Sequence, residues 1–442
     1  MLVVHICTSL EGGAGLCARR IIEAERKAGI DARALVKYGV LPDYAESVPN
    51  DIQREKNPLL RRAKGFLYRR GLWPKCSRYS KIIQRELTLI NETICFTSPR
   101  TLYKGLVIHP WLAEADVIHL HWLGDFLDYE SFFRKVRKPI VWTIHDEYPG
   151  LGGFHYAMWK VHATMNLLKI DEEFTAIKEK AYKEVKSLNL VAISTSMQKF
   201  FQENELLCHF PTTKIHNGID PQAFYPIPKS IARHALGIED DTTVFLFAAF
   251  SISEDRKGLK ELIEALEQVE IDKKLLICLG NYRKKPNASF EIRCEGFVSN
   301  SRLQSIFYSA ADFFMMPSFQ EAFAQTPMEA MACGTPVVAF PCSGSHDLIN
   351  ENNGVVCDDF TVDSLVKGIE VAMRKTYDGA RIRESLLSRF SYDIIAQQYI
   401  KLYRSILSET LLKELHTKTK EMRTKEKITL QRIFLSKNTN SI

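Results

Sequence analysis

The stretch PSFQEAFAQTPMEAMACGTPVV, residues 317–338, leads from one apolar run through a loop and a helix to the next apolar run. The flanking runs, 312–316 and 336–340, predict buried strands. Between them a helix is expected to start near Thr326, with Thr326 as its N-cap and Pro327 at its first helical position. A strand, a loop, a helix and a second strand in this order are typical of a parallel α/β sheet.

The same alternation continues in both directions along the chain. Strands are expected at residues 2–7, 31–37, 116–121, 139–145 and 190–194, and again at 244–250, 274–279, 312–316, 336–340 and 355–357. Helical patterns separate these runs, which predicts an α/β fold with two Rossmann-like, doubly wound parallel-sheet domains. Because such sheets bind ligands at the carboxyl ends of their strands, we expect the site in a cleft between the two domains.

A change of texture marks the boundary between the two domains. The segment PQAFYPIPKS, residues 221–230, carries three prolines and no periodicity. We therefore divide the chain into an acceptor-binding domain at 1–220 and a donor domain at 221–390. A closing helix at 391–410 is expected to pack back toward the first domain, and a basic tail follows at 411–442.

Composition excludes several classes of protein. The 442 residues are 45% hydrophobic and 25% charged, as in soluble globular proteins, and no apolar run is long enough to span a bilayer. We interpret the start, MLVVHICTSLEGG, as a strand and not as a signal peptide. The 10 cysteines occur singly, with no C-x-x-C pair, which indicates reduced thiols and a cytoplasmic protein without a structural zinc site.

Positive charge is concentrated in two places. Residues 54–85 contain eleven Lys or Arg and one acid, interleaved with apolar residues, and the tail after Leu411 is also basic. The first stretch predicts contact with an anionic membrane surface, on the cytoplasmic face of the inner membrane, or with a phosphate-bearing acceptor. A solvated helix face is the open alternative. The tail is expected to be a disordered end. No nucleic-acid-binding module accompanies the charge, so nucleic acid is not an expected partner.

Two carboxylates stand out within residues 317–338. Glu329 follows Glu321 by eight positions, and Thr326-x-x-Glu329 is also the pattern of a capping box, so a purely structural role stays open. The alternative is a diphosphate site: the small residues Ala322 and Ala324 let backbone N–H groups approach an anion at a helix start. Carboxylates are repelled by a phosphate, so they would bind another part of the ligand. Sugar hydroxyls, which donate hydrogen bonds to carboxylates, are the natural choice. Glu321 would then bind the transferred sugar and Glu329 the ribose.

The segment resembles the E-x7-E signature of the family 4 glycosyltransferases, which are retaining enzymes with the GT-B architecture. The match continues from Ala330 through Pro336, and the resemblance covers most of the chain apart from the basic tail. The segments WTIHDEYP, IHNGIDPQAFYP and EDRKGLKELIEAL are most similar to bacterial enzymes that build capsule, exopolysaccharide or lipopolysaccharide. Where the family usually has glycines this chain has Ala322 and Ala324, with Phe323 between them in the donor-binding loop.

The resemblance also assigns residues outside this segment. Lys257 matches the family's phosphate-binding lysine, with Arg256 beside it, although Ala249 and Phe250 stand where the family's upstream arginine is usual. His145, at the end of a predicted strand, matches the cleft histidine that contacts the donor sugar. On their pattern alone, the two cations could equally be surface residues and the histidine a structural one.

Further residues are expected around the cleft. Gly12 and Gly13 lie in a glycine-rich turn that opens the first helix and lets the backbone approach a ligand. In similar enzymes this turn faces the donor phosphate and the acceptor, and an ordinary turn between strand and helix is the open alternative. The acceptor pocket is expected to contain Asp146 and the loop residues Tyr148, Gly152, Gly153, His155 and Tyr156. By resemblance, Val298 lies in the segment that reads the nucleobase. His119 and His121, which share one strand face, are secondary candidates, while His5 is expected to be a satisfied core residue.

The expected reaction transfers a hexose-type sugar from a UDP- or GDP-linked donor to a hydroxyl, with retention of configuration as in the family. No D-x-D pair occurs in the sequence, so the diphosphate would be neutralised by Lys257 and Arg256 and not by a metal, and no cofactor is expected. The acceptor would be a growing surface polysaccharide or a lipid-linked glycan. Two alternatives stay open: a sugar-nucleotide epimerase or hydrolase of the same architecture, and a non-catalytic nucleotide-sugar-binding protein.

Overall fold

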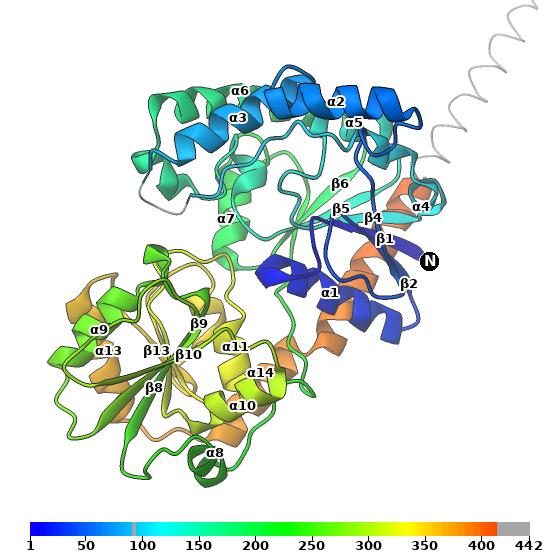
Figure 1. Ribbon diagram of the computed structural model, residues 1–442. Coiled ribbons are helices and arrows are strands. Elements are labelled where there is room, and N and C mark those ends of the chain that lie inside the picture. The colour runs from blue at the N-terminus through cyan, green and yellow to red at the C-terminus, as the bar shows by residue number, and fades with distance from the viewer. Residues whose placement is uncertain (91–93, 413–442) are drawn as a thin grey trace, which may run out of the picture. The chain divides into compact units, whose positions relative to one another are not determined.

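The structure, a computed structural model, describes residues 1–90 and 94–412 and contains two parallel β-sheets (Figure 1). The first sheet has seven strands in the order β3-β2-β1-β4-β5-β6-β7. Its strands are β1 (Leu2–Cys7), β2 (Asp31–Val36), β3 (Ala45–Ser47), β4 (Val117–Leu120), β5 (Ile140–Ile144), β6 (Leu188–Ala192) and β7 (Thr212–Lys214). Its helices are α1 (Gly12–Lys27), α2 (Pro58–Arg70), α3 (Lys75–Leu87), α4 (Pro110–Glu114), α5 (Tyr129–Lys135), α6 (Met165–Tyr182) and α7 (Thr195–Glu203).

The second sheet has six strands in the order β10-β9-β8-β11-β12-β13. They are β8 (Thr243–Ser251), β9 (Lys274–Asn281), β10 (Glu291–Gly296), β11 (Phe313–Met316), β12 (Val337–Ala339) and β13 (Gly354–Val356). Its helices are α8 (Lys229–Ala235), α9 (Leu259–Gln268), α10 (Ser301–Ala310), α11 (Thr326–Ala332), α12 (Ser345–Leu348), α13 (Val362–Met373) and α14 (Gly379–Phe390). Both sheets lie in one compact unit, Met1–Gln397, while residues from Gln398 onward form a second unit.

The predicted fold class is confirmed, because both sheets are parallel and doubly wound. In each sheet the strand order reverses next to its first strand: β1 lies between β2 and β4, and β8 lies between β9 and β11. Such a reversal leaves a crevice beyond the carboxyl ends of the two diverging strands, where ligands of open α/β sheets bind. The folding pattern alone therefore marks β1/β4 and β8/β11 as the places to search for a site.

Burial on both faces explains why the central strands are almost continuously apolar. All five residues of β5, IVWTI, are buried, as are all four residues of β11, FFMM. Parallel sheets covered by helices on both sides need this composition. The exceptions are polar residues in β1, β4 and β5, among them His5, His119 and Thr143, which are 0% exposed.

The structure corrects the sequence-based description at the start of α11. Thr326 is not the N-cap of α11: the N-cap is Gln325, and no side chain caps this helix start. The glycine-rich turn opens the first helix as expected: α1 begins at Gly12, which has a φ of +71°. Glycine tolerates this left-handed value without strain.

The C-terminal part of the chain follows the second sheet. Ser391 forms a bridge with Ile219, and residues 392–412 are helical. Lys27 of α1 forms an ion pair with Asp393, 3.7 Å apart.

Most of the basic tail predicted at 411–442 lies outside the described residues. Within the described part of the chain, no helix combines the length and the apolarity that a membrane crossing requires.

Candidate functional site

A cavity of about 470 Å³ lies at the carboxyl ends of both sheets, at the positions where the strand order reverses. From the first sheet it is lined by the turn after β1, the start of α1 and the residues after β4 and β5; from the second, by the residues after β8 and β11. The lining includes most of the predicted site residues: Gly12, Gly13, His145, Asp146, His155, Arg256, Lys257, Glu321, Ala322, Phe323 and Ala324.

Lys257 and Arg256 reach the cavity from a single 3₁₀ turn, Asp255–Lys257, after β8. Gly258 ends this turn with a φ of +73°, and a Cβ there would lie 1.9 Å from the carbonyl oxygen of Pro317. Glycine is therefore required by both the backbone angle and the close approach. The Phe319 N–H also donates to the Arg256 carbonyl, 2.9 Å, so the loops after β8 and β11 are fastened together.

Glu321 is the point at which these two loops converge. Its carboxylate accepts a hydrogen bond from the Lys257 ammonium and lies 3.6 Å from Nη1 of Arg256. Arg256 is held in turn by Glu254, 2.8 Å away, and by the Gln320 carbonyl, 3.1 Å away. Burial alone would raise the pKa of Glu321, but the charges of Lys257 and Arg256 hold it below its ordinary value. An ionised carboxylate and two cations thus share one wall of the cavity.

The loop that follows Glu321 is held through its carbonyl groups. The Ala322 carbonyl accepts from the Ser343 hydroxyl, 3.2 Å, and the Phe323 carbonyl accepts from Asn217 Nδ2, 3.4 Å. The Phe323 ring is buried and lies against His216 and Phe390. Because a peptide N–H points away from the preceding carbonyl, these contacts fix the direction of the loop's N–H groups as well.

Glu329 lies behind this loop and is not among the residues that line the cavity. Its carboxylate accepts from Arg20 Nη2, 3.3 Å, and from the Tyr308 hydroxyl, 2.9 Å. Arg20, on α1, also donates to Gln325 Oε1, 2.7 Å, and Gln325 does line the cavity. The carboxylate is therefore engaged by side chains and does not serve the capping box that Thr326-x-x-Glu329 allowed.

The first turn of α1 forms the opposite wall. A Cβ added to Gly12 or Gly13 would meet no atom of the protein within 4 Å, so both glycines face open space. Gly15 differs, because a Cβ there would lie 2.4 Å from the Ser9 carbonyl oxygen. Close packing therefore explains Gly15, whereas Gly12 and Gly13 leave the backbone accessible to a ligand.

Asp146 and His155 form a buried ion pair on the side of the first sheet. Asp146 Oδ2 lies 2.6 Å from His155 Nδ1 and accepts from the Trp122 indole, 2.8 Å. His155 Nε2 lies 2.9 Å from the Thr97 hydroxyl. Burial would lower the pKa of His155, but the Asp146 carboxylate prevails and raises it to about 10. The imidazolium is consequently charged at neutral pH.

His145 lines the same wall, directly after β5. Burial lowers its pKa to about 4, against the opposing charge of Asp146, so this imidazole is neutral at physiological pH. Tyr148 does not line the cavity: its ring is stacked on His155, with the ring centroids 4.6 Å apart. Val298 is also absent from the lining, and its carbonyl accepts from the Gln304 side chain, 2.9 Å.

Several lining residues were not identified from the sequence. Asn217, 2% exposed, contributes an amide whose Oδ1 has no hydrogen-bond partner among the described residues. Trp122 also lines the wall beside His155. Tyr156, which the sequence did place in the acceptor loop, lies in the same wall, and Arg256 is 5.7 Å from its ring centroid. Trp122 follows directly after the predicted strand 116–121, which is the one sequence signal that points to it.

Comparisons with known proteins show which family the second sheet and its loops resemble. Residues 229–385, which hold Arg256, Lys257, Glu321 and Glu329, match the family model described as glycosyl transferases group 1. This match covers less than half of the chain. It supports a glycosyltransferase of group 1 for the second sheet and its loops.

Individual relatives extend the similarity into the first sheet. An uncharacterized glycosyltransferase of Methanocaldococcus jannaschii is 26% identical over 313 residues, which are 65% of this chain and 75% of that protein. A D-inositol 3-phosphate glycosyltransferase of Thermobispora bispora is 28% identical over 271 residues, 55% of this chain and 59% of that protein. The chain thus spans 59% to 75% of the length of these two relatives.

A solved structure matches nearly the whole chain. The Anabaena protein HepE, determined in complex with UDP-glucose, has a TM-score of 0.60 at 20% sequence identity, covering 93% of this chain and 100% of that chain. At this level of identity the likeness shows the fold. The two sheets therefore form the GT-B architecture that the sequence predicted.

Proposed function

We propose that this protein is a retaining, metal-independent glycosyltransferase of family 4, which transfers a hexose-type sugar from a UDP- or GDP-linked donor to an acceptor hydroxyl. The observation that carries the proposal is the convergence of Lys257, Arg256 and Glu321 in one cavity with Gly12 and His145. The two cations can bind a diphosphate, and the carboxylate beside them can accept hydrogen bonds from sugar hydroxyls. The group 1 family match and the UDP-glucose complex of the Anabaena neighbour support the same donor class.

The diphosphate is assigned to the two cations and to backbone N–H groups. Lys257 offers a point charge and Arg256 a planar fork of donors, and both already face the cavity. The N–H groups of the 322–324 loop, opposite the open backbone of Gly13, supply neutral donors. Since α11 has only seven residues, its dipole is a smaller contribution than these cations. The sequence lacks D-x-D, and we propose that the two cations take the charge that a metal would otherwise neutralise.

The transferred sugar is assigned to Glu321 and His145, and the ribose to Glu329. In the structure Glu321 is paired with Lys257, so diphosphate binding would draw the ammonium away and free carboxylate lone pairs for hydroxyl groups. Glu329 would have to exchange its contact with Arg20 for the ribose hydroxyls. The acceptor is assigned to the wall of Asp146 and His155, with Tyr148 supporting the His155 ring, and Val298 remains our assignment for the nucleobase.

The proposed chemical step is attack of the acceptor hydroxyl on the anomeric carbon from the face that the diphosphate leaves. The bond from the anomeric carbon to the phosphate oxygen breaks, the new glycosidic bond forms, and the leaving phosphate oxygen takes the acceptor proton. This route needs no protein nucleophile. It needs the diphosphate held firmly while negative charge develops on it, which is the role of Lys257 and Arg256.

A test of the proposal combines product analysis with two variants. Purified protein is incubated with UDP- and GDP-sugars, with and without glycan or lipid-linked acceptors, and in the presence of EDTA. We expect an acceptor-dependent product with the donor's anomeric configuration and turnover that EDTA leaves unchanged. Turnover should fall at least about tenfold in Lys257→Ala and in Glu321→Ala, equivalent to one lost charge-assisted contact.

Lys260→Ala, on the exposed first turn of α9, is the matched control for Lys257→Ala and should retain normal turnover. An inverted product would contradict the proposed step, and near-normal rates in both site variants would contradict the site. Conversion of the donor without any acceptor would instead favour the epimerase or hydrolase alternative.

We also propose that α2 places the enzyme on an anionic lipid surface, where a lipid-linked acceptor would be met. None of its thirteen residues is buried, and Leu59 is 75% exposed. The helix carries exposed arginines and no acid, which is complementary to anionic headgroups. The arginines are Arg61, Arg62, Arg69 and Arg70, and the other exposed apolar residues of this segment are Leu60, Phe66, Leu72 and Trp73.

Vesicle flotation tests this surface. Full-length protein should bind vesicles that contain phosphatidylglycerol and should not bind neutral phosphatidylcholine vesicles. Replacement of the four α2 arginines by glutamine should abolish the binding. The same four-charge loss at Lys367, Arg374, Lys375 and Arg381, which are exposed on α13, α14 and the segment between them, is the control and should leave it unchanged. Equal loss in both variants would show a nonspecific charge effect and contradict the proposal.

A further inference from the structure

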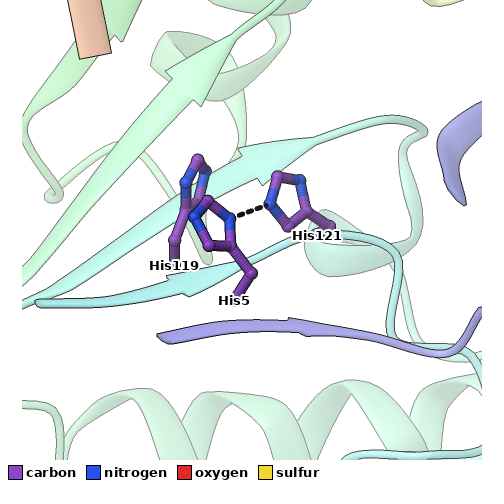
Figure 2. A group of neighbouring side chains, drawn as sticks. All are labelled: His5, His119 and His121. Carbon is purple, nitrogen blue, oxygen red and sulfur yellow. Dashed lines mark hydrogen bonds between the residues drawn. The ribbon is translucent and has the colours of Figure 1, made fainter. Parts of the chain in front are cut away.

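A continuous line of polar side chains leads from the buried core of the first sheet to the cavity. Glu25 Oε2, on α1, lies 2.9 Å from Nε2 of His5. His5 Nδ1 lies 3.0 Å from Nε2 of His121. A dashed line marks this contact in Figure 2. His121 Nδ1 lies 3.4 Å from Nε2 of His145, which lines the cavity. His5 and His121 are each joined to two neighbours through their two different ring nitrogens.

The parallel register of the sheet produces this line. His5 of β1 lies opposite His119 of β4, so His121 is two residues nearer the carboxyl end. Leu120 lies opposite Trp142 of β5, so His145 is again two residues further along than the position opposite His121. Alternate residues of a strand share a face, and the three histidines therefore climb one face of the sheet toward its ligand-binding edge.

The line is enclosed at its inner end. Glu25 and His5 are 0% exposed and His121 is 1% exposed. Burial lowers the pKa of His121 well below its ordinary value, so its ring, like that of His145, is neutral at physiological pH. Polar groups at such depth are stable only when their hydrogen-bonding capacity is satisfied, and each ring nitrogen must therefore take a definite role as donor or acceptor.

The contact between Glu25 and His5 sets the order of these roles when the Glu25 carboxyl group is the acceptor. With Glu25 as the acceptor and a single proton on the His5 ring, that proton lies on Nε2. His5 Nδ1 is then an acceptor, which places the His121 proton on Nε2. His121 Nδ1 is an acceptor in turn, which places the His145 proton on Nε2. At the cavity end of the line, the tautomer of His145 is therefore determined: its Nδ1 carries no proton.

We propose that Glu25, His5 and His121 are positioning residues that lock His145 in the tautomer with its proton on Nε2, so that it presents an acceptor to a hydroxyl of the donor sugar. The inference rests on the proposed function for the identity of the ligand. It adds three residues that touch no substrate and determine what the cavity histidine can recognise. A His145 that donated its proton could pair with a sugar oxygen but could not receive a hydroxyl proton.

The alternative interpretation of these histidines is that they bind a metal ion. His5, His119 and His121 have ligand nitrogens within 4.8 Å of one another (Figure 2). However, the nearest nitrogens of His5 and His121 lie 3.0 Å apart, at hydrogen-bonding distance. The His119 and His121 rings are tilted by 32° against each other, with their centroids 4.1 Å apart. His119 Nε2 lies instead 2.8 Å from the Thr143 hydroxyl.

The tautomers can be measured directly in the full chain. Long-range ¹H–¹⁵N correlation spectra of protein labelled at its histidines distinguish a protonated from an unprotonated ring nitrogen, and a His145→Asn variant assigns the signals. We expect His145 to carry its proton on Nε2 in the unmodified protein, which needs no variant to fold. In Glu25→Gln, whose amide can accept or donate, both tautomers of His145 should be populated.

Glu23→Gln provides the matched control, because it makes the same chemical change on the same helix. Glu23 is exposed and contacts Arg19 and Tyr44, 2.8 and 3.1 Å away, and not the histidine line. It should leave His145 unchanged. A proton on Nδ1 in the unmodified protein, or an Nε2 proton that persists in Glu25→Gln, would overturn the proposal. Stoichiometric zinc in the purified protein, bound to the histidines, would overturn it as well.

Ligand affinities separate this inference from the proposed function. UDP and GDP lack the sugar, whereas UDP-glucose and GDP-mannose carry it. Glu25→Gln should weaken the sugar nucleotide that binds by about tenfold relative to its free nucleotide, the effect of one hydrogen bond, with no change of this ratio in Glu23→Gln. Equal weakening of both ligands would mean a merely structural role. If none of the four ligands binds the unmodified protein, the proposed function fails, and the tautomer measurement alone decides the histidine line.

Discussion

Glu321 and Lys257 are two nearly buried charged side chains of the candidate site that satisfy each other. The Glu321 side chain is 11% exposed and the Lys257 side chain 17% exposed, and they are hydrogen-bonded to each other. A carboxylate this enclosed needs a partner, and Lys257 supplies it. Under the proposed function a diphosphate would replace Glu321 as the partner of Lys257, while sugar hydroxyls would replace Lys257 as the partner of Glu321. In the absence of the donor, the two side chains therefore satisfy each other, and donor binding replaces their mutual hydrogen bond.

This exchange leads to a prediction with opposite signs for binding and for turnover. Glu321→Gln keeps the shape of the side chain and removes its competition for Lys257. We expect UDP or GDP to bind as tightly as before or up to about tenfold more tightly, while turnover with the sugar nucleotide falls at least about tenfold. Calorimetric titration and initial rates measure the two effects. A parallel loss of both would show that Glu321 does not compete with the diphosphate.

His155 gives a prediction for the dependence of stability on pH. Its pKa is raised to about 10 in the folded protein, against about 6.5 for an ordinary histidine. A raised pKa stabilises the fold fully below pH 6.5, and this contribution is lost as the pH rises toward 10. We therefore expect the gap in Tm between the unmodified protein and His155→Gln to be largest at pH 6 and to shrink steadily up to pH 10. A gap that widens over this range would contradict the charged imidazolium.

At the scale of helices and strands, the sequence was most informative where burial is complete. The predicted strands at 2–7 and 274–279 agree with β1 and β9 to within two residues, because strands covered on both faces must be apolar throughout. The edge strands β3 and β7 were not predicted. Each has only three residues, with mostly exposed or half-buried polar side chains, so neither apolarity nor alternation marks them.

The site was predictable in part for the same reason. Lys257, Glu321 and His145 each follow a strong strand pattern, and the carboxyl ends of such strands meet at one edge of their sheet. Arg20 could not be found in this way: its partner Glu329 lies 309 positions away, and nothing near Arg20 in the sequence marks it. The histidine line depends on register between three strands, which a single sequence does not reveal.

The contact of Arg20 with Glu329 joins α1 to α11 and gives a prediction for these elements. Both side chains are under 10% exposed. Removing one partner from such a pair leaves a buried charge, so Arg20→Met should destabilise the protein by about 3 kcal/mol. Adding Glu329→Gln to that variant should restore part of the loss. Denaturant unfolding of the two single variants and the double variant measures the coupling. Strictly additive losses would show that the two side chains do not interact.

At the scale of the whole molecule, two sheets of the same construction contribute different halves of one cavity. The first supplies an open backbone at Gly12 and Gly13, the neutral His145 and the charged pair of Asp146 and His155. The second supplies Lys257, Arg256 and Glu321 from the loops after β8 and β11. Each half lies where its own strand order reverses, so a single topological rule accounts for the place of both.

The most direct test of this account is an isothermal titration of the full-length protein with UDP and with GDP, repeated for Lys257→Ala and for Lys260→Ala. We expect one of the two nucleotides to bind with a stoichiometry of one per chain, an affinity at least about tenfold weaker in Lys257→Ala, and no change in Lys260→Ala. Absence of binding at saturating concentrations of both nucleotides, or equal affinity in all three proteins, would contradict the claim that this cavity holds a nucleoside diphosphate.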